Sequence, residues 1–413
     1  MRCSPGEHNI KGDNDSMIGV TRLLCGAAQS GDALRYGRHG AASHGGASHG
    51  GTRDSLQRKP IVVWNSTKAC NLACAHCYYG ASERKAADEM STVEAKHMID
   101  NLAAFGAPVL LFSGGEPLMR ADLLELGAYA RERGLRTVIS TNGTLISEKR
   151  ARQIEKTGFS YVSISLDGIG ATNDAFRGVP GAYEAALAGI RNCKRAGVRV
   201  GLRLTLHKHN VADLEPIFAL LDREEIPRAC FYHLVYSGRG RVIRDDDLTL
   251  DESRRAVELI FQQAEHLHAR RPEVEILTVD NHTDAPYLLR RVQERQPERA
   301  EEVLRLLRWN GGNASGIAIA DIDHRGGVHA DQFWQHYTFG NVRERPFGEI
   351  WTDTRDPLMA GLKDRRPLLK GRCAACRYLD ICNGNLRVRA EAVHGDVWAP
   401  DPACYLSDEE VLA

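Results

Sequence analysis

Residues 61–80, IVVWNSTKACNLACAHCYYG, join a short β-branched run to three closely spaced cysteines, Cys70, Cys74 and Cys77. The run has the composition of a buried strand, and the cysteines follow the point where that strand ends. Similar runs recur along the chain, separated by amphipathic helical stretches such as VEAKHMIDNLAAFG (93–106) and AYEAALAGIRNCKRAG (182–197). These runs are PVLLFSGG (108–115), RTVISTNG (136–143), YVSISLDG (161–168), RVGLRLTL (199–206) and ACFYHLVY (229–236).

Six strand–helix units in succession predict an α/β fold with a parallel sheet wrapped by helices, a partial (β/α)6 barrel of the TIM type. Sites in such folds gather at the carboxyl ends of the strands. Polar residues lie at these ends here: the cysteines after the first strand, SGGEP after the second, TNG after the third and LDG after the fourth. We therefore expect one functional site at this end of the barrel.

The composition narrows the class of protein. A chain of 413 residues that is 43% hydrophobic can bury a large core and carry a second, smaller domain. Basic and acidic residues balance at 54 each, which favours neither a nucleic-acid partner nor a membrane surface. No apolar run is long enough to span a bilayer, and no secretory signal precedes the first strand. Eleven cysteines, an odd and clustered set, favour a cytoplasmic metal-binding protein over a disulfide-bonded secreted one.

Four segments are predicted along the chain. Residues 1–57 are rich in Gly, Ser, Ala and His, include SHGGASHGG, and are expected to form a disordered extension. Its histidines (His39, His44 and His49) are either loose metal ligands or part of a solvated linker, and we favour the linker. Residues 58–272 form the predicted core, 273–315 a helical connector, and 316–413 a smaller C-terminal domain.

The C-x3-C-x2-C spacing of the first cysteines decides which cofactor they suit. A structural zinc ion needs four ligands, and His76 stands beside Cys77, a poor arrangement for both to bind one ion. A four-iron cubane takes one outside ligand on each iron, so three cysteines leave one iron open. Together with SGGEP (113–117), this spacing resembles the radical S-adenosylmethionine (radical SAM, or AdoMet) superfamily. The resemblance implies that the open iron chelates the amino and carboxylate groups of AdoMet, and that Cys70, Cys74 and Cys77 are the catalytic ligands.

The same resemblance implies a set of AdoMet contacts. Gly114 and Gly115 would allow close approach, and Glu116 would pair with the amino group, although a glycine turn with a capping acid is the alternative. Arg177 and Arg203 are candidates for carboxylates of AdoMet or substrate, or else ordinary ion pairs. The remaining expected contacts are His76, Pro117, Ser163, Ser165 and Asp167, with Ser165 preferred to Ser163 for the ribose or carboxylate.

A second constellation lies near the C-terminus, in RCAACRYLDICNGNLRVRAEAVHGDVWAPDPACYL (372–406). Its cysteines, Cys373, Cys376, Cys382 and Cys404, can saturate a cubane, with a zinc knuckle as the alternative. A hairpin, GIAIADIDHRGGVHA (316–330), precedes them, as in the auxiliary-cluster (SPASM or twitch-like) domains of radical SAM enzymes that modify peptides and tetrapyrroles. The stretch VHADQFW (328–334) lacks a further cysteine, which favours one auxiliary [4Fe-4S] cluster over two.

Longer motifs resemble one branch of this superfamily more closely, the radical SAM proteins of haem d1 biosynthesis (the NirJ family). They are SISLDGIGATNDAFRG (163–178), YLLRRVQERQPERA (287–300), HYTFGNVRERPFGEIWTDTRDPLMAGLK (336–363) and NLRVRAEAVHGDVWAPDPACYLSDEE (385–410). Asn383 departs from the pattern, in which a glycine is expected.

The resemblance implies that a 5′-deoxyadenosyl radical takes hydrogen from propionates of a didecarboxysirohaem, which are replaced by oxo groups. It also implies a tetrapyrrole substrate, a flavodoxin- or ferredoxin-type electron donor and a monomer. Propionate partners are expected among Arg239, Arg241, Arg387 and Arg389, and iron ligands at His329 and His336. A solvated surface position is the alternative for each of these residues.

Two other activities remain open at this point: a haem synthase that decarboxylates coproporphyrin propionates, and a maturase that acts on a peptide. The maturase is expected to carry a peptide-recognition segment before its core, and residues 1–57 show none. A cluster-binding protein without catalysis is least favoured, because an open iron beside GGEP has no use without AdoMet.

Overall fold

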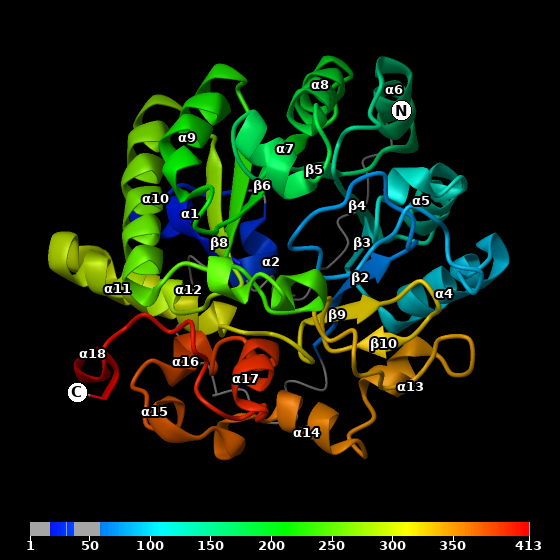
Figure 1. Cartoon of the computed structure of the whole chain (residues 1–413). Coiled ribbons are helices and arrows are strands. Elements are labelled where there is room, and N and C mark those ends of the chain that lie inside the picture. The colour runs from blue at the N-terminus through cyan, green and yellow to red at the C-terminus, as the bar shows by residue number, and fades with distance from the viewer. Residues whose placement is uncertain (1–16, 30, 37–57, 413) are drawn as a thin grey trace, which may run out of the picture.

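The computed structural model describes residues 17–29, 31–36 and 58–412. One ten-stranded sheet lies at its centre, in the order β1-β8-β7-β6-β5-β4-β3-β2-β9-β10 (Figure 1). Strands β2 to β9 run parallel to their neighbours, and the edge strands β1 and β10 are antiparallel. Because β1 and β10 pair only on one side, the sheet forms an unclosed barrel. The predicted α/β fold with a parallel, partly closed barrel is confirmed.

The strands are β1 (Ile18–Gly19), β2 (Ile61–Asn65), β3 (Val109–Ser113), β4 (Arg136–Thr141), β5 (Tyr161–Ser165), β6 (Val200–Thr205), β7 (Arg228–Tyr232), β8 (Glu275–Val279), β9 (Ile319–Ile322) and β10 (Val328–His329). The helices of the barrel side are α1 (Val20–Cys25), α2 (Asp32–Tyr36), α4 (Thr92–Phe105), α5 (Leu123–Glu132), α6 (Glu148–Thr157), α7 (Ala171–Arg177), α8 (Ala182–Arg195), α9 (Leu214–Arg223), α10 (Leu250–Arg270), α11 (Asp284–Arg295) and α12 (Ala300–Asn310). The C-terminal helices are α13 (Phe347–Trp351), α14 (Pro357–Lys363), α15 (Gly371–Ala374), α16 (Leu379–Cys382), α17 (Arg387–His394) and α18 (Asp408–Leu412). Short 3-10 turns are η1 (Pro117–Met119), η2 (Val211–Asp213), η3 (Gly238–Arg241), η4 (Arg244–Asp246), η5 (Pro297–Arg299) and η6 (Arg366–Leu368).

All six strands expected from the sequence are present, as β2 to β7, and the expected hairpin is the β9–β10 pair. The helical connector predicted for 273–315 needs correction, because it begins with β8. All five residues of β8 are buried, and the strand lies between β7 and β1 in the sheet. Strand β9 of the predicted C-terminal domain pairs with β2, so both parts of the chain share one sheet.

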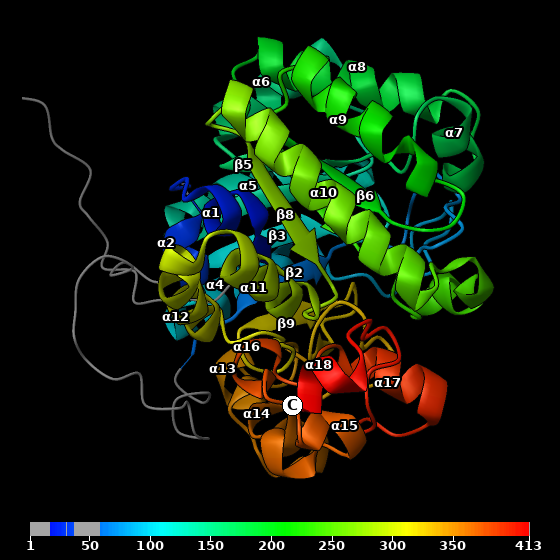
Figure 2. The same cartoon turned by 90° about the vertical axis from the view of Figure 1, so that its left-hand side faces the viewer.

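Part of the N-terminal extension is folded, so the expectation of disorder throughout 1–57 is wrong for residues 17–29 and 31–36. Ile18 pairs with Thr278 of β8, and helix α1 packs against β8 and α10 (Figure 2). Arg35 forms a buried ion pair with Glu275, which also lies 3.2 Å from Arg228. This segment could not be predicted from local sequence pattern, because its partners lie some 260 residues away in the chain. His39, His44 and His49 lie outside the described residues.

Local signals explain where the long helices begin and end. Ser91 and Glu94 form a capping box at the start of α4, and Thr249 and Glu252 form another at the start of α10. Gly106 ends α4 with φ +86°, a conformation that glycine adopts without strain. No helix in the described ranges has the length and apolar character needed to cross a bilayer.

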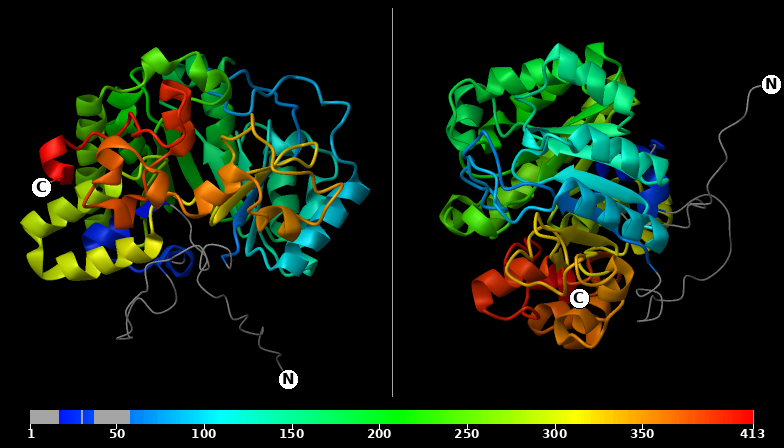
Figure 3. Two further views of the ribbon diagram at one scale, coloured as in Figure 1. Left: turned by 90° about the horizontal axis from the view of Figure 1, so that it is seen from below. Right: turned by 90° about the vertical axis from the view of Figure 1, so that its right-hand side faces the viewer.

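The short C-terminal helices form a separate layer at one end of the barrel, below α11, α12 and the β9–β10 hairpin (Figures 1 and 3). This layer places the second set of cysteines on the side of the barrel where β9 joins the sheet.

Candidate active site at the strand ends

The carboxyl ends of the parallel strands surround a cavity of about 130 Å³. The loop after β2 contributes the three cysteines, and the loops after β3, β4 and β5 contribute the residues that face them. The predicted site residues that line it are Cys70, Cys74, His76, Cys77, Gly114, Gly115, Ser165, Asp167, Arg177 and Arg203. The expectation of one site at the strand ends therefore matches the arrangement of these side chains.

Each of the three cysteine sulfurs faces one protein donor. The backbone N–H of Leu72 donates to Cys70 and that of Ala81 donates to Cys77, both at 3.4 Å. Arg177 Nη1 lies 3.5 Å from the Sγ of Cys74. Donors of this kind stabilise thiolates, which are the form that iron binds.

The three thiols also share one environment. Burial raises the pKa of Cys70 to about 12, and the nearby Cys74 and Cys77 add to that rise. Binding of iron must therefore release protons from this loop. Convergent thiols with preset donors and a neighbouring cavity fit a cubane cluster with one open position.

Gly114 and Gly115 allow a close approach, but the neighbour is the protein's own backbone. A Cβ at Gly115 would lie 2.2 Å from the carbonyl oxygen of Ala69, and one at Gly114 would lie 2.7 Å from that of Thr67. The N–H of Gly115 donates to Thr67 and the N–H of Glu116 to Ala69, each at 2.7 Å. The glycines thus dock the SGGEP loop against the start of the cysteine loop, while their faces still line the cavity.

Glu116 acts as the capping acid of the η1 turn in this structure. Its carboxylate accepts hydrogen bonds from Thr141 Oγ1 and from the backbone N–H groups of Leu118 and Asn142. The side chain is fully buried and does not line the cavity, and Pro117 begins the η1 turn behind it. A role for Glu116 and Pro117 in AdoMet binding therefore stays a prediction that this geometry does not favour.

Asp167, Arg177 and His76 form a buried network beside the cysteines. Arg177 Nη2 lies 2.5 Å from Asp167 Oδ2, and His76 Nε2 lies 3.5 Å from the same oxygen. Burial opposes ionisation of Asp167, but Arg177 and His76 outweigh it and hold the pKa of that carboxyl below its usual range. Burial lowers the pKa of His76 to about 4, so this ring is neutral near pH 7. The ordinary ion pair is thus the observed role of Arg177.

Ser163 and Ser165 do not share one cavity. Ser165 lines the cavity beside the cysteines, whereas Ser163 faces a second cavity of about 130 Å³ inside the barrel. Arg203 lines both cavities, and its guanidinium lies 4.6 Å from the ring of Tyr232. The preference for Ser165 over Ser163 agrees with this placement.

Several residues that line the cavity were not predicted from the sequence. Asn142 follows β4 and donates to the side chain of Asn71 in the cysteine loop at 2.9 Å. Its strand-end TNG position was a usable signal. His233 and Asp280, which follow β7 and β8, also line the cavity. Asp280 could not be found from sequence, because its strand lay inside the predicted connector.

The four C-terminal cysteines come from α15, the turn after it, the end of α16 and the loop before α18. Burial raises the pKa of Cys382 well above its usual value, and Cys404, Cys373 and Cys376 raise it further. Thr283 hydrogen-bonds to the thiol of Cys404. The four partly buried thiols therefore lie near one another, as a cluster site requires.

Neither set of cysteines in the described ranges is arranged around one ion position. Within the described ranges, no three Cys, His, Asp or Glu side chains converge on one ion position. All ten cysteines of those ranges are free thiols. A cubane, whose ligands bind separate irons, tolerates wider spacing than one zinc ion does.

Most of the expected substrate contacts prove to be structural. Arg387 donates to the carbonyls of Val397 and Ala399, and Arg389 forms a doubly bonded pair with Asp401 in which both side chains are 0% exposed. The structure does not support these two arginines as propionate partners, because their guanidiniums are buried and bonded within the fold. Arg241 donates to the carbonyl of Tyr236 and does not line the cavity.

The two histidines expected at a tetrapyrrole iron also lie elsewhere. His329 is buried, with Nδ1 2.7 Å from the carbonyl of Tyr337, and His336 pairs with Glu391 at 2.8 Å. Neither lines the cavity. The structure therefore does not support either histidine as an iron ligand.

Arg239 is the exception among the expected propionate partners. It donates to the carbonyls of Cys74 and Ala81 and so supports the cysteine loop, while its buried Nη2 has no hydrogen-bond partner among the residues that the structure describes. The residue lines the cavity.

Asn383, the departure from the expected glycine, adopts φ +54° and donates to the carbonyl of Asn313 at 2.8 Å. Asparagine tolerates this conformation, so the loop keeps its turn.

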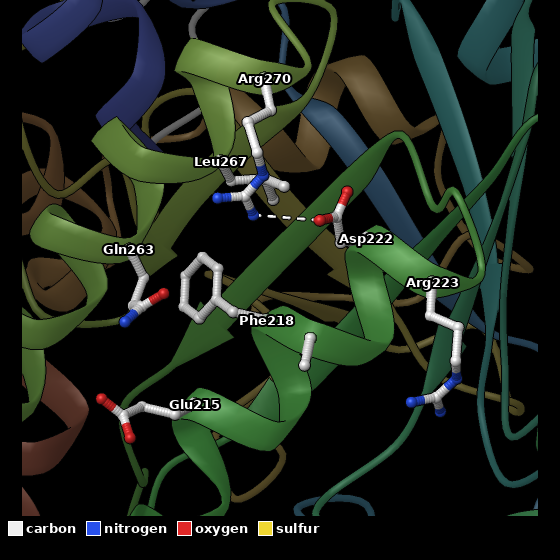
Figure 4. A pocket seen from close by; sticks show the side chains of 8 residues that line it. Glu215, Phe218, Asp222, Arg223, Gln263, Leu267 and Arg270 are labelled. Carbon is white, nitrogen blue, oxygen red and sulfur yellow. Dashed lines mark hydrogen bonds and ion pairs between the residues drawn. The ribbon is translucent and has the colours of Figure 1, made fainter.

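A larger hollow of about 500 Å³ lies outside the barrel between α9 and α10 (Figure 4). It is lined by Phe218 and by the ion pair of Asp222 with Arg270, at 3.0 Å. It contains none of the cysteines or strand-end residues, so it is separate from the candidate site.

Comparison with known proteins identifies the family. The family model of the radical SAM superfamily matches residues 64–221. The chain is 57% identical to the Fe-coproporphyrin III synthase of Methanosarcina barkeri, over 96% of this chain and 99% of that protein. It is 45% identical to the pre-heme d1 synthase of Dinoroseobacter shibae, over 85% and 87%, and 32% identical to the AdoMet-dependent heme synthase of Nitratidesulfovibrio vulgaris, over 83% and 91%.

Solved structures share the fold at lower identity. Streptococcus suis SuiB bound to precursor peptide SuiA is 19% identical, with a TM-score of 0.67 over 84% of this chain and 76% of that one. Native anSMEcpe with bound AdoMet and Cp18Cys peptide is 17% identical, with a TM-score of 0.63 over 84% and 94%. From its sequence relatives and from the cysteine loop at its strand ends, this chain belongs to the radical SAM superfamily.

Proposed function

We propose that the chain is a radical SAM enzyme that acts on the carboxylate-bearing side chains of an iron tetrapyrrole and forms Fe-coproporphyrin III. The observation that carries this proposal is the 57% identity to a protein of that activity along 99% of that protein's length. The haem d1 activity implied by the sequence motifs is the second candidate, supported by 45% identity to a pre-heme d1 synthase.

In this proposal Cys70, Cys74 and Cys77 hold a [4Fe-4S] cluster, and AdoMet occupies the open position. When bound there, AdoMet supplies a 5′-deoxyadenosyl radical that takes hydrogen from the substrate. Ser165 and the Gly114–Gly115 backbone line the cavity and are placed to contact AdoMet. Arg177 keeps Asp167 and the Cys74 loop in register.

Two guanidiniums are suited to the acid side chains of the substrate. Arg203 and Arg239 line the cavity, and neither has a carboxylate partner among the described residues. Arg239 is held by the backbone of the cysteine loop, and Arg203 by Ser140 and the ring of Tyr232. Fixed guanidiniums bind carboxylates with defined geometry, so these two residues would set the orientation of the tetrapyrrole.

Cys373, Cys376, Cys382 and Cys404 are proposed to hold a second [4Fe-4S] cluster, with four thiolates and no open iron. Such a cluster would exchange electrons near the substrate rather than bind AdoMet. A flavodoxin- or ferredoxin-type donor, a monomeric state and a cytoplasmic location remain the expectations from sequence.

The test is anaerobic reconstitution with iron, sulfide and AdoMet, followed by incubation with didecarboxysirohaem and mass spectrometry of the products. Formation of Fe-coproporphyrin III supports the first candidate, and loss of propionates with gain of oxo groups supports the second. A separate incubation with Fe-coproporphyrin III tests the haem synthase alternative, in which propionates are decarboxylated. If neither of these two tetrapyrroles changes while AdoMet is cleaved, the candidate activities on them are wrong and the peptide alternative is favoured.

A further inference from the structure

Asp280 directly follows β8, at the same edge of the sheet as the cysteine loop. It lines both the cavity beside the cysteines and the cavity inside the barrel. Its side chain is 92% shielded from solvent, since its relative exposure is 8%. A carboxyl in this position faces whatever molecule fills the space next to the cysteines.

The backbone of Asp280 is in a conformation that side chains rarely adopt. Its φ is +65°, in the left-handed region, where only four non-glycine residues of the described ranges are found. Strained backbone of this kind tends to be retained at functional sites. Glycine adopts this region freely, and asparagine and aspartate both tolerate it, so the turn by itself does not require an acidic residue.

Asp280 also lacks the partners that buried carboxylates normally have. Within the described part of the chain, no hydrogen bond or ion pair reaches its side chain. The charged groups that face it from the neighbouring elements are Arg203 of β6, His233 after β7, Asp331 after β10 and Arg389 of α17.

Three of those neighbours, Arg389, His233 and Asp331, are engaged with other groups. Arg389 is bound to Asp401, and His233 lies 3.1 Å from Asp284. Asp331 accepts hydrogen bonds from Ser315 and from the N–H of Phe333. Asp280 therefore has hydrogen-bonding capacity, unused among the described residues, that a molecule occupying the cavity can take up.

We propose that Asp280 is a substrate-contacting residue whose neutral carboxyl donates a hydrogen bond to a carboxylate side chain of the tetrapyrrole, next to the guanidinium of Arg203. This inference rests on the proposed function, because it takes the ligand to be a tetrapyrrole with acid side chains. The pairing gives one substrate carboxylate both a cation and a neutral donor. An ionised Asp280 would instead repel that carboxylate.

The protonation of Asp280 agrees with this role. Burial, and next the charge of Asp331, raise the pKa of Asp280 to about 7. Below that pH the group is the neutral donor, and above it the carboxylate form opposes binding of an anion. Substrate carboxylates are ionised throughout pH 6 to 8.5, given an ordinary pKa of about 4.5. Substrate affinity is therefore expected to fall as pH rises through about 7, by up to about tenfold per pH unit.

The experiment measures binding rather than turnover. Fe-coproporphyrin III and, separately, didecarboxysirohaem are titrated into the anaerobic, cluster-loaded protein, and Kd is followed by visible absorbance from pH 6 to 8.5. D280N keeps a donor that cannot ionise, and D280G removes the side chain at a φ that glycine accepts. D321N is the matched control, because burial also raises the pKa of Asp321 to about 7, yet this residue is bonded to Asn65 and Gln335 and lines neither cavity.

We expect D280G to weaken binding at pH 6 by about tenfold or more, the value of a hydrogen bond to a charged group. D280N should bind within about threefold of wild type at pH 6 and should lose the pH dependence, so that it binds more tightly than wild type at pH 8.5. D321N should keep the wild-type profile. Thermal melting and first-cluster iron content establish that each variant is folded and loaded.

Three results would overturn the inference. They are a D280N profile that follows wild type, a D280G affinity equal to wild type at pH 6, and an equal loss of binding in D280N and D280G. If wild type binds a tetrapyrrole and D280N and D280G bind it equally well, the role of Asp280 is wrong but the proposed function stands. If wild type binds neither tetrapyrrole, both the proposed function and this inference are wrong.

Discussion

Arg177 Nη2 lies 2.5 Å from Oδ2 of Asp167, with both side chains buried. The same guanidinium is 3.5 Å from the Sγ of Cys74. One residue of α7 thus joins the LDG turn after β5 to the cysteine loop after β2, two motifs that are about 90 residues apart in sequence. The ion pair holds the cysteine loop at the strand ends.

Replacing Arg177 with methionine should lower the free energy of unfolding by about 3 kcal/mol or more, because Asp167 becomes an unpaired buried charge. The double variant R177M/D167N should recover part of that loss. Anaerobic urea unfolding measures both. The control is R133M, since Arg133 pairs with Asp100 on the surface and such a pair contributes less than about 1 kcal/mol. Equal effects of R177M and R133M would contradict the prediction.

Alanine at Cys70, Cys74 or Cys77 should abolish AdoMet cleavage while the protein stays folded, because these residues occupy a strand-end loop. Formation of 5′-deoxyadenosine and iron content are the measurements. C193A is the control: Cys193 is buried in α8, away from both sets of cysteines, and should retain cleavage. Persistent 5′-deoxyadenosine formation in the triple-alanine variant would show that the ligand assignment is wrong.

Anaerobically loaded protein should contain about eight irons, and C404A about four. C404A should still form 5′-deoxyadenosine but should convert less tetrapyrrole, because the remaining cluster is the one that binds AdoMet. Circular dichroism must show that C404A is folded, since metal binding and folding are coupled in small domains. If wild type contains only four irons, or if the second site holds zinc, the prediction of an auxiliary cluster is wrong.

Replacing Gly115 with alanine should displace the SGGEP loop, because the new Cβ would lie 2.2 Å from the Ala69 carbonyl. We expect G115A to lose first-cluster iron and AdoMet cleavage. G134A shows the effect of backbone strain without a clash: Gly134 has φ +85° and open space around its Cβ position, so only about 1 kcal/mol of strain is expected, whereas Gly115 is not in the left-handed region. A G115A variant with full iron content would show that the two loops move independently.

The N-terminal segment supplies a pH-dependent contribution to stability. Burial opposes ionisation of Glu275, but Arg35 and Arg228 outweigh it and lower the pKa of Glu275. A lowered folded-state pKa gives stability above the unfolded value, near 4.5, that is lost as pH falls through the folded-state pKa. The free energy of unfolding of R35M at pH 7 should therefore be about 3 kcal/mol lower than that of wild type. On acidification, R35M should lose less additional stability than wild type. Parallel pH profiles of the two proteins, from urea unfolding between pH 7 and 3, would contradict this.

Much of the barrel followed from local pattern. The strands β2 to β7 are short β-branched runs, and each ends at a polar or glycine-containing turn, as buried parallel strands do. Strand β8, EILTV, is followed by the polar residues Asp280 and Asn281, but it lies between helices α10 and α11, so its place in the sheet was missed. Residues 17–36 were missed for a related reason, because their strand is only two residues long and pairs with β8.

By itself, the sequence determined the cysteine sets, the strand ends that carry them and the family, because ligand spacing and strand pattern are local properties. Only the tertiary structure decided which polar side chains face the cavity. Glu116, Arg387 and Arg389 resemble ligand-binding residues in sequence, but their hydrogen bonds go to the protein itself. Asp280 does not stand in a recognised ligand-binding motif, yet it faces the cavity without a partner among the described residues. A buried polar group takes its role from the donors and acceptors that folding brings near it, and those come from distant parts of the chain.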